Sequence, residues 1–105
     1  MAEPGDDRHR LVIEAGVADA IAGRRPVVAL ESTIFSELGL PDPANREALD
    51  RVLAAVGAGG AVPALTAVLD GRLRVGVEPE DHDRICGPAT KVAARDLAMA
   101  VTAGA

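Results

Sequence analysis

A run of four apolar residues, Val-Val-Ala-Leu at positions 27–30, constrains the fold of this chain more than any other feature. A short continuous apolar run that contains adjacent valines is typical of a strand buried on both faces, as in parallel sheets. We therefore predict an interior strand at about residues 27–30. Glu31 follows directly, and a carboxylate beside a buried segment is costly unless another group pairs with it or the protein uses it.

Two helices are predicted around this strand. Residues 11–22 are mostly apolar and precede Gly23, a residue type that commonly ends helices. Residues 43–57 begin with Pro43, which suits the first helical position, and they carry apolar side chains on one face and charged side chains on the other. Both helices are expected to pack against the sheet that contains the apolar strand.

A hairpin is predicted in the second half of the chain. Asp70-Gly71 is a strong signal for a two-residue turn between antiparallel strands. Residues 61–69 before the turn are mostly apolar, and in residues 73–77 after it apolar side chains alternate with others. A short helix over residues 79–85 is expected to follow. Strands and helices in this order predict an α/β fold.

Charge and composition exclude several classes of protein. The chain has 105 residues, enough for one domain, and a formal net charge of -5, without the basic stripe that nucleic-acid binding needs. No apolar run approaches the roughly 18 to 20 residues of a membrane span, and the acidic start does not resemble a signal peptide. We therefore expect a cytoplasmic protein with neither nucleic acid nor a membrane as partner. Only one residue is aromatic, and so thin a core indicates a piece of a larger unit.

Glu31 is the strongest candidate for chemistry. Ligand sites in open α/β sheets gather at the carboxyl ends of strands, which is where the pattern places this acid. A structural acid that caps a neighbouring helix or pairs with an arginine is an equal alternative on spacing alone. Ser32 and Thr33 add hydroxyl groups that could hold a phosphate or a carboxylate, or merely start a turn.

Lys91 is the second candidate, because it is the single lysine among eleven basic residues. Lysine supplies a compact charge for phosphate or an amine that burial can tune, and arginine does not replace it in those roles. Chance is the alternative explanation. Cys86 is interpreted as a small core residue and His82, among charged neighbours, as a solvated side chain. No group of potential ligands has metal-binding spacing.

Three segments, VVALESTIFSELGLPDPAN, GAVPALTAVLDGRLRVGV and KVAARDLAMAV, occur in an order that resembles the amino-terminal part of the pseudouridine-5'-phosphate glycosidase family. The resemblance implies an α/β/α fold, and for the full-length family member a homotrimer and a manganese ion. It also implies cleavage of the C–C glycosidic bond of pseudouridine 5'-phosphate to uracil and ribose 5-phosphate. Glu31 then matches the family's proton donor, and Lys91 matches a lysine that contacts the substrate.

The chain also departs from the family pattern. The family's covalent lysine, which attacks C1' of the sugar to form an imine, and its metal-binding aspartate match positions beyond residue 105. Glu37 and Leu38 stand where many relatives have a His-Gly pair. The resemblance thus implies the amino-terminal portion of a single glycosidase domain, inactive on its own. The alternative, from another class, is a non-catalytic module that binds ribose phosphate or a partner.

Overall fold

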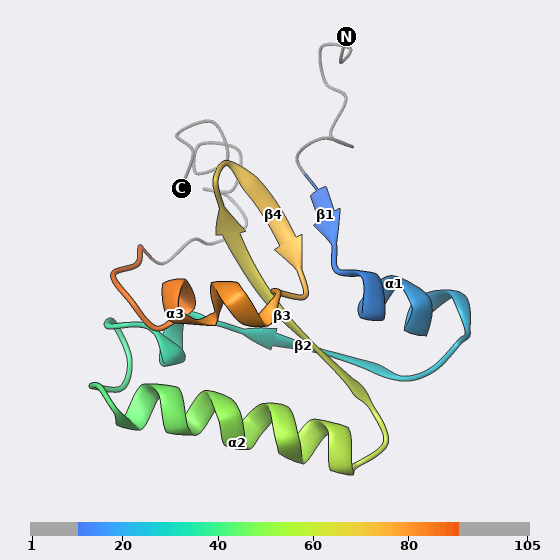
Figure 1. Ribbon diagram of the computed structural model, residues 1–105, viewed down its shortest axis with the longest axis horizontal. Coiled ribbons are helices and arrows are strands. Elements are labelled where there is room, and N and C mark those ends of the chain that lie inside the picture. The colour runs from blue at the N-terminus through green and yellow to red at the C-terminus, as the bar shows by residue number, and fades with distance from the viewer. Residues whose placement is uncertain (1–10, 91–105) are drawn as a thin grey trace, which may run out of the picture.

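The computed structural model describes residues 11–90, and its strands form one mixed sheet (Figure 1). Strand order across the sheet is β1, β4, β3, β2. β1 is parallel to β4, β2 is parallel to β3, and β3 and β4 are antiparallel. The elements in chain order are β1 (Leu11–Ile13), α1 (Ala15–Ala22), β2 (Val27–Glu31), η1 (Thr33–Phe35), α2 (Ala44–Ala58), β3 (Val62–Leu69), β4 (Arg72–Val75), η2 (Pro79–Asp81) and α3 (His82–Ile85). The predicted α/β fold is confirmed.

The apolar run at residues 27–30 does form a strand, but its predicted interior position is wrong for the described residues. Within residues 11–90, β2 has β3 as its one neighbour and therefore lies at an edge of the sheet. Val28 is 40% exposed, so the strand is not covered on both faces. A continuous apolar run indicates burial on both faces only where neighbouring strands and helices surround it, and the described elements leave one edge of β2 open.

The first predicted helix begins later than expected. Residues 11–13 form β1, which pairs in parallel with β4, because β-branched Val12 and Ile13 suit a strand. The Glu14 carboxylate then accepts a hydrogen bond from the backbone N–H of Gly16 (2.7 Å) and caps the start of α1. The helix ends at Gly23 as predicted. Local composition set the end of this helix, whereas pairing with a distant strand set its start.

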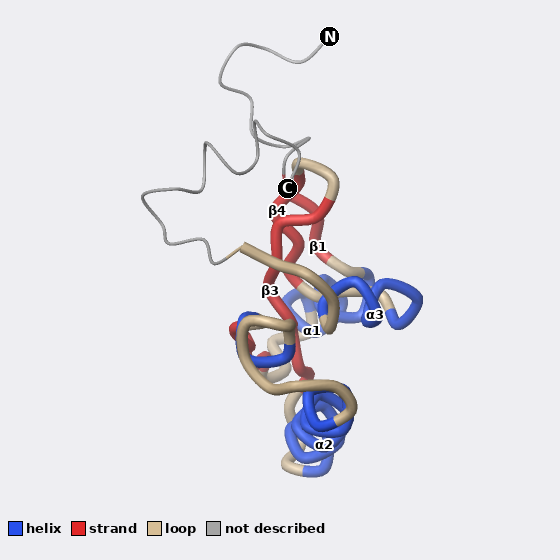
Figure 2. The backbone as a smooth tube through the Cα atoms, turned by 90° about the vertical axis from the view of Figure 1, so that its left-hand side faces the viewer, coloured by secondary structure: helices blue, strands red, loops and turns tan. Residues whose placement is uncertain are grey.

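The second helix, α2, lies close to its predicted bounds and supplies the core. Leu49 on its inner face is fully buried, and it packs with residues from β3, η1 and α3. Figure 2 shows α2 at one end of the molecule and the hairpin of β3 and β4 extending away from it. No helix within the described ranges is long and apolar enough to cross a membrane. The buried cluster consists of Phe35, Leu49, Leu65, Leu69, Val77 and Ile85.

The hairpin turns at Asp70 and Gly71, as the sequence predicts. Both residues have positive φ angles, 53° and 73°, which is the pattern of a type I′ turn. Arg84 of α3 donates two hydrogen bonds to the Asp70 carboxylate, at 3.0 and 2.8 Å. These two hydrogen bonds join α3 to the tip of the hairpin. Hydrogen bonding from Arg84 is also the main cause that lowers the pKa of Asp70.

We expect the Asp70→Asn variant to be slightly less stable than the unsubstituted chain at pH 7. Asparagine tolerates the same left-handed backbone but cannot form the charged pair with Arg84. Because the folded-state pKa of Asp70 is lowered, its contribution is complete above the unfolded value of about 4 and is lost as pH falls through the folded value. Thermal melts from pH 7 to pH 2 should therefore show the difference between the two chains shrinking in acid. A difference independent of pH would contradict this assignment.

Candidate active site at the carboxyl end of β2

Glu31 is the last residue of β2 and lies at the edge of a broad cleft, as its sequence position predicts. Its side chain is exposed to solvent, so no burial penalty has to be offset. One carboxylate oxygen, Oε1, accepts a hydrogen bond of 2.6 Å from the backbone N–H of Thr33, the first residue of η1. The acid thus caps the turn that follows β2, as the structural alternative expects, and this contact leaves the catalytic alternative open. The second oxygen is free of any protein hydrogen bond found within residues 11–90.

The hydroxyl groups beside Glu31 join β2 to β3. Glu31 and Thr66 stand opposite each other in the parallel ladder. The Ser32 hydroxyl donates to the backbone oxygen of Thr66 (2.8 Å), and the Thr66 hydroxyl donates to the backbone oxygen of Leu30 (3.1 Å). These two bonds fix the carboxyl end of β2 against the middle of β3. The hydroxyl hydrogen of Ser32, a candidate donor to phosphate from the sequence, is thus used within the protein.

Hydrogen bonds and burial hold the inner side of the turn after β2. Ser36 is 1% exposed, and its hydroxyl donates to the backbone oxygen of Thr33 (2.6 Å) while accepting from the backbone N–H of Leu38 (3.1 Å). Phe35 is buried in the core beside it. The backbone N–H of Glu37 then donates to the backbone oxygen of Gly87 (3.0 Å), which links this turn to the segment after α3. Glu37 and Leu38 themselves are exposed.

The cleft that these segments enclose has a volume of about 870 Å³ and opens to solvent. One wall is the end of β2 with η1, another is the second half of β3, and the third is α3 with the segment that follows it. Thr90, the last described residue, belongs to this third wall. Lys91 lies outside the described residues. The lining consists of Glu31, Ser32, Thr33, Ser36, Thr66, Ala67, Val68, Leu69, Leu73, Asp83, Arg84, Ile85, Gly87, Pro88, Ala89 and Thr90.

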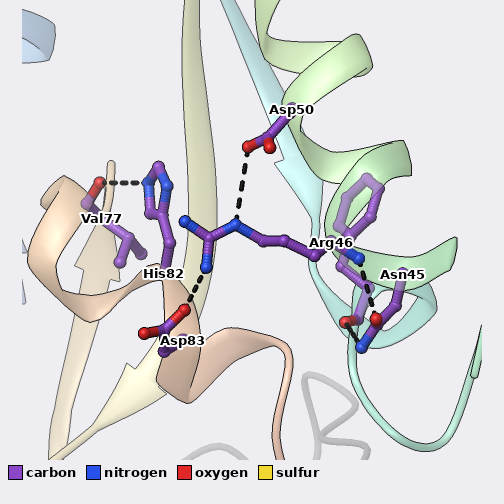
Figure 3. Close-up of polar contacts among 7 residues, drawn as sticks. Asn45, Arg46, Asp50, Val77, His82 and Asp83 are labelled. Atoms are coloured by element: carbon purple, nitrogen blue, oxygen red, sulfur yellow. Dashed lines mark hydrogen bonds and ion pairs between the residues drawn. The ribbon is translucent and has the colours of Figure 1, made fainter. Parts of the chain in front are cut away.

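Charges at the cleft are largely paired with one another. Among the described lining residues Arg84 is the only base, and its guanidinium is held by Asp70 and, at 3.5 Å, by Asp81. Asp83 pairs with Arg46 of α2, which also lies 3.6 Å from Asp50 (Figure 3). An anionic ligand would therefore need a cation from outside this described lining, or would have to displace Asp70 from Arg84.

His82 and Cys86 have structural surroundings. A ring nitrogen of His82, Nε2, lies 3.2 Å from the backbone oxygen of Val77 (Figure 3), and the residue is partly buried. The expectation of a solvated side chain is therefore wrong. Burial raises the pKa of the Cys86 thiol, which disfavours the reactive thiolate and agrees with the interpretation of Cys86 as a core residue. No group of three or more potential metal ligands comes together among residues 11–90.

Thr66, Ser36 and Asn45 were not predicted from the sequence as parts of this region. A strand parallel to β2 must place some residue opposite Glu31, so the sequence predicts that such a residue exists. That this residue is Thr66 follows only from the register of the assembled sheet. Ser36 bonds within its own turn, to Thr33 and Leu38, whereas Asn45 contacts the distant Cys86, and no pattern in the sequence marks either residue.

The chain is similar to several curated proteins that share one name. The Rhodospirillum centenum protein named pseudouridine-5'-phosphate glycosidase is 54% identical over 96 residues, which are 90% of this chain and 30% of the relative. A protein of the same name from Sorangium cellulosum is 48% identical over 100 residues, 92% of this chain and 31% of the relative. The chain thus spans about 30% of the length of these curated relatives. The resemblance seen in the sequence is confirmed.

Two solved structures share the fold. The prealnumycin C-glycosynthase AlnA, solved in complex with ribulose 5-phosphate, superposes with a TM-score of 0.73 at 36% identity, over 90% of this chain and 30% of AlnA. An indigoidine synthase A-like protein from Thermotoga maritima gives a TM-score of 0.73 at 26% identity, over 97% of this chain and 34% of that one. Residues 16–105 match the family model described as indigoidine synthase A like protein, and the chain belongs to that family.

Proposed function

We propose that this chain is the amino-terminal part of a pseudouridine-5'-phosphate glycosidase, a hydrolytic enzyme that cleaves the C–C glycosidic bond to give uracil and ribose 5-phosphate. The observation that carries the proposal is the position of Glu31, at the carboxyl end of a parallel strand and at the mouth of a large cleft. The names of the curated relatives give the reaction. The ribulose 5-phosphate bound to AlnA supports a pentose phosphate as the ligand.

The role proposed for Glu31 is proton donor. A C–C bond has no heteroatom leaving group to protonate, so the sugar ring is opened first: the nitrogen of a lysine bonds to C1' as the C1'–oxygen bond breaks, and a general acid gives its proton to that oxygen. The C1'–C5 bond then breaks with its electron pair going to the uracil ring, which is protonated at C5, and the lysine nitrogen and C1' are left as an imine that water hydrolyses to ribose 5-phosphate. The oxygen of Glu31 that does not bond to the Thr33 N–H has no other hydrogen bond within residues 11–90, and it is the one proposed to carry that proton to a substrate in the cleft.

Lys91 is proposed to contact the substrate. The described lining offers no unpaired base for a phosphate group, since Arg84 is engaged by Asp70. Lys91 directly follows Thr90, which lines the cleft, and that adjacency in the chain supports the assignment. A fixed cation at the phosphate would orient the sugar for attack at C1'.

The metal and the assembly rest on the resemblance. Residues 11–90 do not fit a manganese site, since they bring no ligand cluster together, and no step above uses the metal. A homotrimer is proposed for the full-length protein. Ile34 in η1 and Leu38 after it, exposed by 51% and 54%, are apolar residues that a further surface could cover. A cytoplasmic location is proposed because a phosphorylated nucleoside is charged and does not cross membranes unaided.

The decisive experiment compares this chain alone with the same chain joined to the remaining two thirds of the Rhodospirillum centenum relative. We expect uracil release from pseudouridine 5'-phosphate only by the completed protein, because Lys91 is the chain's single lysine and is assigned to contact rather than attack. Borohydride reduction with ribose 5-phosphate should trap an adduct outside residues 1–105. An adduct on Lys91 would overturn the assignment. Binding of ribose 5-phosphate by a completed protein that releases no uracil would favour the non-catalytic module.

A further inference from the structure

Asn45, in the first turn of α2, is a buried polar residue that the reaction above does not use. Its side chain is 1% exposed. The amide nitrogen Nδ2 donates to the backbone oxygen of Phe35 (3.1 Å) and to the backbone oxygen of Cys86 (2.9 Å). The amide oxygen Oδ1 accepts from the backbone N–H of Arg46 (2.8 Å), as Figure 3 shows. Both amide hydrogens and the amide oxygen therefore have hydrogen-bond partners, which fixes the orientation of the side chain.

The two carbonyl groups that accept from Asn45 belong to two different walls of the cleft. The Phe35 carbonyl lies in the peptide group that leads into Ser36, and the Cys86 carbonyl lies in the peptide group that leads into Gly87. Ser36 and Gly87 both line the cleft. One side chain thus bridges the turn that follows Glu31 and the segment that leads toward Lys91.

We propose that Asn45 is a positioning residue that holds these two walls at the spacing needed to bind the sugar phosphate. The proposal rests on the proposed function, since it assumes that the cleft is the sugar-phosphate site. A direct backbone bond, from the Glu37 N–H to the Gly87 oxygen at 3.0 Å, crosses the same gap. Glu37 is an exposed residue, whereas Asn45 is 1% exposed, and Asn45 supplies two hydrogen bonds across the gap where the backbone supplies this one.

Removing the amide leaves the carbonyl groups of Phe35 and Cys86 without their donor, in a buried and a partly buried bond respectively, which favours separation of the walls. The Glu37 amide reports this separation, because its own hydrogen bond breaks when the walls part. The Gly76 amide, bonded to the Leu65 oxygen at 2.7 Å, reports opening of the sheet instead. Amide hydrogen exchange on the 105-residue chain, followed by NMR, distinguishes local from global opening.

In Asn45→Ala, protection of the Glu37 amide should fall about tenfold or more relative to the Gly76 amide. Leu49→Ala is the matched control for lost packing, because Leu49 is equally buried one turn further along α2 and packs in the same core as η1, β3 and α3, but its side chain makes no hydrogen bond to either wall. In that variant both amides should lose protection by the same factor. Should Asn45→Ala fail to fold, Asn45→Ser retains one donor and is expected to show a smaller shift of the same kind. Equal loss at both amides in the Asn45 variants, or an unprotected Glu37 amide in the unsubstituted chain, would overturn the proposal.

Titration of the completed protein with ribose 5-phosphate is the second arm. Asn45→Ala should weaken binding about tenfold or more at a temperature where it remains folded, whereas Leu49→Ala should bind normally. Unchanged binding in Asn45→Ala would remove the positioning role even if the exchange result held. If the unsubstituted protein does not bind ribose 5-phosphate at all, the proposed function fails, while the exchange experiment still decides whether Asn45 bridges the walls.

Discussion

Substituting Glu31 by glutamine in the completed protein should lower the turnover rate by about 10²- to 10⁴-fold, the usual loss when a general acid is removed. Glutamine has nearly the same size, and its side-chain oxygen can still accept the hydrogen bond from the Thr33 N–H, so the turn after β2 keeps its cap. It cannot deliver a proton. The structure therefore predicts a large loss of rate with little loss of folding stability.

Rates and thermal melts measured on the same preparations separate a catalytic acid from a structural one. Glu47→Gln is the matched control, since Glu47 is an exposed acid on α2 outside the cleft and its replacement removes the same charge. That variant should keep its rate. A Glu31→Gln protein that melts earlier yet retains its rate per folded molecule would assign Glu31 to the cap alone, and the proton donor would have to be another group.

The structure shows which atoms of Glu31 a structural role would use. Spacing alone leaves a proton donor and a structural acid equal, and the structure agrees with both, since the carboxylate caps η1 and also lies at the cleft. Capping of η1 is visible in the 2.6 Å bond to the Thr33 N–H, while pairing with an arginine is not found within residues 11–90. The cap uses one oxygen only. A general acid needs just one oxygen, so the two roles are compatible in a single carboxylate.

The location of Glu31 could be predicted because it depends on local pattern. Four apolar residues followed by an acid predict a strand with a polar residue at its carboxyl end. The turn at Asp70 and Gly71 is predictable for a similar reason, because these residue types favour positive φ angles by themselves. The edge position of β2 could not be predicted, because it depends on which strands lie beside it. The strand β1 was missed for the same reason, since three residues show no periodicity and only pairing with β4 defines them.

The bridge made by Asn45 was also beyond sequence reasoning. Its two acceptors lie 10 residues before it and 41 residues after it in the chain. An asparagine near a helix start is ordinarily interpreted as a cap, and the α2 cap position is in fact Pro43, with no side-chain hydrogen bond. Only the assembled fold shows that this amide faces inward to two turns.

The largest stability effect is expected for Gly76→Ala. Gly76 follows β4, is buried, and has a φ angle of 84°, a left-handed conformation that costs other residues about 1–3 kcal/mol. A Cβ atom there would lie 2.7 Å from Cβ of Glu14 and 2.8 Å from Cγ2 of Val17, which is fully buried. Forcing α1 away from the sheet adds about 1–3 kcal/mol of overpacking.

Together these terms predict a loss of about 2 to 6 kcal/mol, a large share of the roughly 5–15 kcal/mol that stabilises a typical domain. The melting temperature should fall by about 10 °C or more. Gly57→Ala is the matched control, because Gly57 is an exposed residue of α2 and an added Cβ meets nothing within 4 Å. There the same substitution should stabilise the chain by about 0.5–1 kcal/mol, since alanine favours a helix. Calorimetric melts of both variants therefore test whether the same substitution lowers the melting temperature at Gly76 and raises it at Gly57. A Gly76→Ala chain that melts no earlier than the unsubstituted one would show that α1 is not held against β4 through this contact.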